Sequence, residues 1–97
     1  MVIVFREKLY AFAKKHADSR KALVVWQREV EKANWKSGLD VIATFPHAKI
    51  IRQNRARFPI RHNVYRLITY INYEDRLVFV RFIGTHKEYD RIDPETI

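Results

Sequence analysis

The sequence predicts an α+β fold, in which an N-terminal strand and two to three helices pack on one face of a mostly antiparallel sheet of four to five strands. Apolar residues recur at helical spacing as far as residue 44 and alternate with period two from residue 48 onward. The 97 residues suit a single domain, 1–97, and a hydrophobic content of 47% suffices for a core. A charged content of 31% with two Gly and three Pro argues against disorder.

The first half of the chain is expected to be helical after one strand. Each helix presents one apolar stripe, such as Leu23, Trp26 and Val30 in the second helix. The short break before that helix predicts an antiparallel helix pair. Ser37 and Asp40 occupy capping-box positions at the start of the third helix. The expected elements are a strand at Val2–Phe5 and helices at Arg6–Ala17, Arg20–Lys32 and Ser37–Thr44.

The second half is expected to form four strands and a C-terminal segment that is mostly coil. In the second of these strands the odd positions are mainly basic and the even positions apolar, which predicts one basic face. Pro59 has no N–H donor, so this strand is an edge strand or is bulged there. The expected strands are Ala48–Gln53, Arg55–Arg61, Val64–Ile71 and Leu77–Gly84, and the coil is Thr85–Ile97.

The net charge of +8 is concentrated in the middle of the chain. Residues 41–73 contain six Lys or Arg and no acid, whereas residues 74–97 carry a net charge of −2. Such a stretch indicates a polyanion such as RNA, because each cation near a phosphate releases a counterion on binding. The alternative is a solvated basic face that aids solubility.

Two arginines interrupt the apolar strands of the last hairpin. With a two-residue loop at Glu74-Asp75, Arg66 lies opposite Ile83, and Arg81 becomes its diagonal neighbour on the same face, about 7–8 Å away. Two guanidinium groups at that separation match the geometry of one phosphate. The alternative is that each arginine pairs with an acid, and a register slip of one residue would separate them.

The segment after this hairpin gathers groups suited to proton transfer. A histidine side chain can take up and return a proton near neutral pH, and His86 is followed closely by Lys87 and Tyr89. Metal-free RNA cleavage needs a base for the 2′-OH, an acid for the leaving oxygen, and cations for the phosphorane charge. The sequence supplies all three, although a polar tail explains the same residues almost as well.

Several other classes of protein are excluded or disfavoured. The absence of Cys excludes disulfides, thiolate zinc sites and a cysteine nucleophile, and it suits a reducing compartment. The four histidines show no i,i+4 pairing, and no glycine-rich phosphate loop is present. No apolar run approaches the ~18 residues of a membrane span, and no secretory signal is visible. The expectation is therefore a cytoplasmic protein with no metal or other cofactor.

Three stretches of the chain resemble a known family. They are Lys32–Ser37, Asn63–Leu67, and Arg81–Asp90 with its Thr-His-Lys-Glu-Tyr-Asp end. In these stretches the chain is similar to HigB-type toxins, a subgroup of the RelE/ParE superfamily of bacterial toxin–antitoxin modules. The resemblance covers nearly the whole chain and implies a RelE-like fold.

The resemblance also implies a function and partners. Such toxins are mRNA interferases that cut mRNA without a metal, usually on a translating ribosome, through attack by the 2′-OH. The implied partner is a helix-turn-helix antitoxin of the HigA type, and operator DNA is bound only through the antitoxin complex. The residues expected to be catalytic are Arg66, Arg81, His86 and Tyr89, where Arg81 comes from the hairpin geometry. The residues expected to bind RNA are Lys49, Arg55, Arg57, Arg61 and Lys87.

The chain departs from the family pattern at two places. His62-Asn63-Val64 stands where relatives usually have Gly-Asn-Lys, and Pro59 replaces a polar strand residue. Two alternatives stay open: a ParE-like toxin that inhibits a protein such as gyrase, and an RNA-binding module without catalysis. A gyrase inhibitor needs no proton carrier, so His86 and Tyr89 argue against it. Trp35 is expected in the core, with base stacking as its alternative role.

Overall fold

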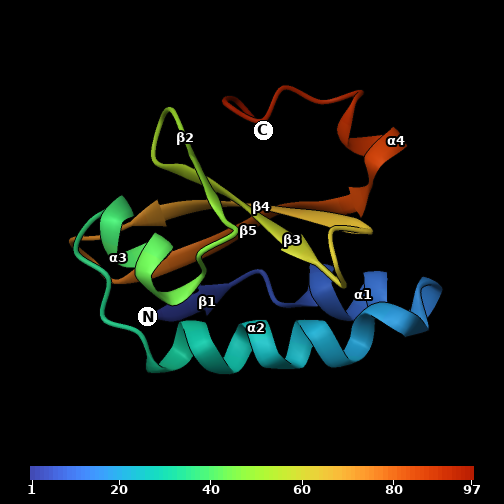
Figure 1. Ribbon diagram of the computed structural model, residues 1–97, viewed down its shortest axis with the longest axis horizontal. Helices are drawn as coiled ribbons and strands as arrows, with labels where there is room; N and C mark the ends of the chain where they lie inside the picture. Colours follow the sequence, from blue (N-terminus) through green and yellow to red (C-terminus); the bar gives the residue numbers. More distant parts are fainter.

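A five-stranded sheet in the order β1-β5-β4-β3-β2 forms the centre of the fold in the computed structural model, which describes residues 1–97 (Figure 1). β1 runs parallel to β5, and all other neighbouring strands are antiparallel. The strands are β1 (Val2–Val4), β2 (Lys49–Ile51), β3 (Arg55–Ile60), β4 (Tyr65–Asn72) and β5 (Leu77–Thr85). This arrangement confirms the predicted α+β fold with its mostly antiparallel sheet.

Two longer helices cover one face of the sheet, and the C-terminal segment crosses the other side (Figure 1). Arg6, just before the first helix, donates a hydrogen bond to Gln27 at 2.7 Å and forms an ion pair with Glu31 at 3.1 Å, late in the second helix. These contacts confirm the antiparallel helix pair. The helices are α1 (Glu7–Lys15), a 3₁₀ turn (Ala17–Ser19), α2 (Arg20–Lys32), α3 (Gly38–Thr44) and α4 (His86–Tyr89).

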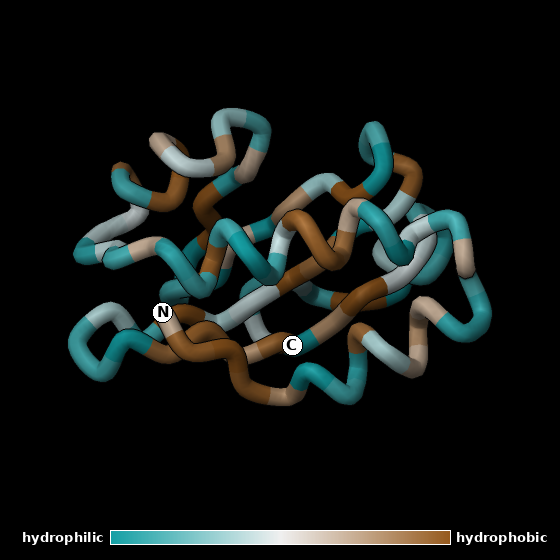
Figure 2. The backbone as a smooth tube through the Cα atoms, turned by 90° about the horizontal axis from the view of Figure 1, so that it is seen from below, coloured by the Kyte–Doolittle hydropathy of each residue, from teal (hydrophilic) through white to brown (hydrophobic).

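The core lies between these helices and the sheet. Figure 2 views the molecule from the helical side and shows hydrophobic stretches along the strands, while the helices alternate between hydrophobic and hydrophilic residues. Trp26 and Trp35 are each 2% exposed, and both pack against Phe58 of β3. The indole N–H of Trp35 donates to the Thr44 hydroxyl at 2.9 Å. Trp35 is therefore a core residue, and its base-stacking alternative is excluded in this conformation.

The capping boxes differ from the prediction. Ser37 precedes α3, but its side chain makes no capping hydrogen bond, and the Asp40 carboxylate accepts from the Lys36 amide at 2.8 Å. The box instead forms at α4, where Thr85 and Glu88 satisfy each other's backbone amides. The prediction that Thr85–Ile97 is mostly coil therefore missed a helix, although the Thr-x-x-Glu pattern was present in the sequence.

The last hairpin keeps the predicted register only near its turn. The loop has four residues, Tyr73–Arg76, yet Asn72 still faces Leu77. A bulge between Ile68 and Thr69 then shifts β5 by one residue. Arg66 consequently lies opposite Gly84 and not Ile83, and Arg81 has no partner residue on β4. The predicted diagonal pairing of Arg66 with Arg81 is wrong, because a bulge inserts one unpaired residue.

The basic strand also ends earlier than predicted. β3 ends at Ile60, and Arg61 lies in the following turn with φ of 52°. β2 pairs only with Arg55–Arg57, so Pro59 has no neighbour on that side and the strand is locally an edge there, as its missing N–H predicted. None of the helices has the length and apolarity needed to cross a bilayer.

Candidate functional site

The phenol of Tyr89 on α4 lies against two guanidinium groups of the sheet. Arg57 Nη1 donates a hydrogen bond to the Tyr89 hydroxyl at 3.1 Å, and its Cζ lies 5.6 Å from the ring centroid. The Cζ of Arg66 lies 4.6 Å from the same centroid. Both separations are within the range of cation–π attraction. Side chains from β3, β4 and α4 therefore meet at one point on the face opposite α1 and α2.

Arg66 is held there at a cost in hydrogen bonding. Its Nε is buried and makes no hydrogen bond. A buried donor left unsatisfied costs about 1–3 kcal/mol in typical proteins. The Tyr89 ring offsets part of this cost through its attraction for the cation. Native proteins leave few buried donors without a partner, so this one calls for an explanation.

A capping hydrogen bond and the packing around Gly84 fix the position of α4 at the end of β5. The Thr85 amide donates to the Glu88 carboxylate at 2.8 Å, which holds the pKa of Glu88 below its usual value. Gly84 leaves room for the Phe82 ring and for Glu88, because a Cβ at this position would come within 2.6 Å of Phe82 Cζ. Phe82 in turn packs against Tyr89, with ring centroids 6.4 Å apart. The helix position thus depends on Gly84 as well as on the cap.

His86 begins α4, one helical turn before Tyr89. Residues three apart lie on the same side of a helix, so both side chains start from one side of α4. His86 Nε2 hydrogen-bonds the backbone carbonyl of Asn63, in the β3–β4 turn. A carbonyl only accepts, so Nε2 carries the proton and Nδ1 of the neutral ring is free to take one up.

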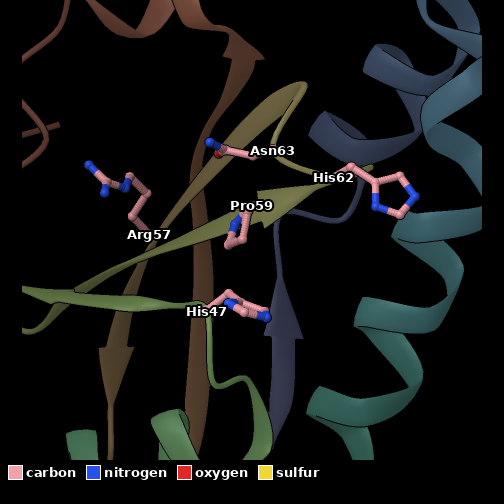
Figure 3. Close-up of a pocket in the computed structure, with 5 residues that line it drawn as sticks. All are labelled: His47, Arg57, Pro59, His62 and Asn63. Atoms are coloured by element: carbon pink, nitrogen blue, oxygen red, sulfur yellow. The ribbon is translucent and has the colours of Figure 1, made fainter.

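A hollow of about 550 Å³ opens beside this cluster. Figure 3 shows Arg57, Pro59, Asn63 and His47 around it, with the His62 ring turned to one side, away from Arg57. Sequence reasoning missed His47, His62 and Asn63 as site residues. His47 and His62 are far apart in sequence and do not have the spacing of metal ligands on one helix, so the sequence did not predict that both line one hollow. No group of three or more His, Asp or Glu side chains is placed to hold a metal ion.

Three of the predicted residues lie around the Tyr89 cluster without being part of it. Lys49 faces Arg57 across β2 and β3, and both line a second hollow of about 360 Å³ on the other side of Tyr89. Arg55 lies over the Tyr70 ring at 5.4 Å and donates two hydrogen bonds to the Ile97 carbonyl. Lys87 is exposed on α4.

Two predicted residues point elsewhere. Arg81 Nε donates to the Ile97 carbonyl at 3.2 Å, so Arg81 does not join Arg66 in one phosphate-binding pair. Arg57, predicted only to bind RNA, takes the place beside Arg66. Arg61 forms an ion pair with Asp18 at 3.3 Å, next to the helices. Its prediction as part of the basic face is wrong, because the left-handed turn conformation breaks the strand alternation.

Comparison with known proteins identifies the family of the chain. The model of one family, described as the RelE-like toxic component of a toxin–antitoxin system, matches residues 19–92. No curated protein shows a significant match to the chain. The matched region contains β2 to β5, α4 and every residue that contacts Tyr89 through its side chain. The chain therefore belongs to the HigB toxin family, the RelE-like toxic components of toxin–antitoxin systems.

Proposed function

We propose that this toxin is a metal-independent endoribonuclease that cleaves mRNA, bound on the ribosome, and thereby stops translation in the cytoplasm. The observation that carries the proposal is the contact of Tyr89 with both Arg57 and Arg66, one helical turn from His86. The basic face supplies cations for the RNA backbone on both sides of this cluster. A toxin that only binds a protein target has no need of a proton carrier beside two arginines.

The proposed reaction assigns a role to each group. The neutral His86 ring accepts the 2′-OH proton at Nδ1, since Nε2 is committed to the Asn63 carbonyl. The 2′-oxygen then attacks the phosphorus, and the 5′-oxygen leaves as a 2′,3′-cyclic phosphate forms. Arg57 and Arg66 stabilise the negative charge of the phosphorane, and Tyr89 donates a proton to the 5′-oxygen.

The same family membership implies an antitoxin partner. We propose that it is a helix-turn-helix protein of the HigA type, and that the toxin meets operator DNA only through this complex. Lys49, Arg55 and Arg57 present a basic surface that attracts an acidic segment of such a partner as well as RNA.

Mapping of mRNA 5′ ends after expression of the toxin tests the proposal. New 5′ ends are expected with the natural chain, and they should disappear with His86→Ala or Arg66→Ala. Arg28→Ala is the matched control, since Arg28 is an exposed cation on α2, on the face of the sheet opposite the Tyr89 cluster. The circular dichroism spectrum of each variant is compared with that of the natural chain to verify that the variant is folded. Growth arrest without new 5′ ends, or normal cutting by both variants, would contradict the assignment and favour a protein target.

A further inference from the structure

The last five residues, Asp93–Ile97, lie across the basic face and are named the C-terminal strap here. In Figure 1 the red end of the chain runs back from α4 above the sheet toward β2. The Ile97 carbonyl accepts hydrogen bonds from Arg55 Nη2 at 2.9 Å, Arg55 Nε at 3.2 Å and Arg81 Nε at 3.2 Å. Glu95 lies 3.9 Å from Arg52. The strap thus contacts three of the arginines on this side of the sheet.

Hydrogen bonds within the strap hold it in a turn that directs the Ile97 oxygen toward those arginines. The amides of Thr96 and Ile97 donate to the Asp93 carbonyl at 3.1 Å and 3.0 Å, and the Glu95 amide donates to the Asp93 carboxylate at 3.0 Å. Asp93, Pro94 and Glu95 also form one wall of the hollow that contains Lys49, Arg57 and Tyr89. The strap therefore borders the catalytic cluster on the side away from His47.

The oxygen atoms that the strap presents to the arginines resemble those of a nucleic-acid backbone. One oxygen atom is bound by two guanidinium groups, and the carboxylates of Asp93 and Glu95 precede it along the chain. Arginine binds phosphate oxygens with the same N–H groups. The strap offers one such oxygen at this place, whereas an RNA strand offers a phosphate at every nucleotide and gains from counterion release along the basic face. RNA is therefore able to displace the strap.

We propose that the C-terminal strap is an internal competitor that occupies the phosphate-binding arginines Arg55 and Arg81 until RNA displaces it. This inference rests on the proposed function, because it takes the ligand of the basic face to be RNA. Once the strap has moved, Arg81 binds a phosphate of the RNA backbone beside the cleavage site. One of the contacts that hold the strap is weak: Arg52 has 86% of its side chain exposed, and ion pairs of this kind contribute little to stability.

A shortened chain that ends at Ile92 tests the proposal. It keeps the hydrogen bonds from the amides of Asp90 and Ile92 that complete α4, and it loses two carboxylates and no cation. The matched control is the full-length double variant Glu7→Gln/Glu74→Gln, which removes two exposed carboxylates away from the basic face. The probe is a single-stranded RNA oligonucleotide with 2′-O-methyl groups, which the enzyme cannot cut, and binding is followed by fluorescence anisotropy at several salt concentrations.

The shortened chain is expected to bind this RNA about tenfold more tightly than the control near 0.15 M salt, because two further phosphate contacts release counterions. The slope of log K against log salt should steepen by about 1.4, since each contact with a single strand contributes about 0.7. Arg81→Gln should weaken RNA binding several-fold in the shortened chain and much less in the full-length chain, where the strap already occupies Arg81.

Equal affinity and slope for the shortened chain and the control would overturn the proposal, as would an equal effect of Arg81→Gln in both lengths. Weaker binding by the shortened chain would show that the strap binds RNA itself, and would also overturn it. If the shortened chain does not fold, Asp93→Asn/Glu95→Gln in the full-length chain replaces it, with an expected gain of about twofold over the control. Failure of the full-length chain and all variants to bind RNA would refute the proposed function, which is a separate outcome.

Discussion

Replacement of Gly84 by alanine tests whether the position of α4 controls the catalytic cluster. A Cβ at this position would lie 2.6 Å from Phe82 Cζ, 3.0 Å from Glu88 Oε1 and 3.2 Å from Glu88 Cβ. Ordinary contact begins near 3.4 Å, so the Phe82 ring, which packs against Tyr89, must withdraw by about 0.8 Å. Overpacking of this kind typically costs about 1–3 kcal/mol.

The expected result of Gly84→Ala is a lower midpoint of thermal unfolding together with a larger loss of cleavage. A misplacement of about 1 Å at reacting groups can cost about a hundredfold in rate, and both His86 and Tyr89 move with α4. Thermal unfolding by circular dichroism and cleavage of a short RNA measure the two effects. Adding Phe82→Leu to Gly84→Ala should restore part of both, because the shorter side chain vacates the space.

Gly38→Ala is the matched control. A Cβ there meets only the flexible Ile50 side chain, at 3.1–3.4 Å, and Gly38 is the first residue of α3, where alanine favours the helix. This variant should keep full stability and activity. Unchanged unfolding and cleavage in Gly84→Ala, or a Phe82→Leu double variant no better than the single one, would refute the reasoning.

Three further predictions concern other contacts of the site and its support. Arg57→Lys should lower the rate of RNA cleavage about tenfold or more with little change in unfolding temperature. The reason is that a lysine cannot both hydrogen-bond the Tyr89 hydroxyl and cover the Tyr89 ring. Single-turnover RNA cleavage measures this rate. The hydrogen bond from the Thr85 amide lowers the pKa of Glu88, so the stability that its cap gives α4 is present above the ordinary carboxyl pKa and is lost as pH falls through the lowered pKa. Glu88→Gln should therefore abolish the acid-induced loss of protection that hydrogen exchange measures at the α4 amides. If the loss of protection persists in this variant, another group causes it. Tyr65→Phe removes the hydrogen bond to Asp18 at 2.7 Å that raises the pKa of Tyr65, and should lower the midpoint of urea unfolding while leaving cleavage intact.

Much of the fold was predictable because its causes are local. The α2 range was predicted to the residue, and β3 and β5 to within one residue at each end, since apolar periodicity is a property of short segments. The errors arose where contacts between segments decided the outcome. The Asp40 carboxylate reaches the amide of Lys36 and not that of Ser37, and the bulge at Ile68/Thr69 depends on how two strands pack along their whole length.

The candidate site was predictable in part. Arg66 and Tyr89, two of the four residues predicted to be catalytic, are in contact, and His86 lies on the same short helix as Tyr89. Arg57 was assigned only to RNA binding, because nothing in linear spacing shows that its side chain reaches a helix 32 residues away. The hollow formed by His47 and the His62-Asn63 turn was not predicted for the same reason.

The sequence by itself determined the α+β class, the order of the elements as far as β5, the core position of both tryptophans and the concentration of positive charge in the middle of the chain. These properties follow from residue type and short-range periodicity. Only the tertiary structure decided which arginines meet Tyr89, because a one-residue bulge moved Arg81 away from Arg66 while the β2–β3–β4 pairing placed Arg57 beside it. It also decided that the acidic end of the chain lies on the basic face, since that contact joins residues 42 positions apart.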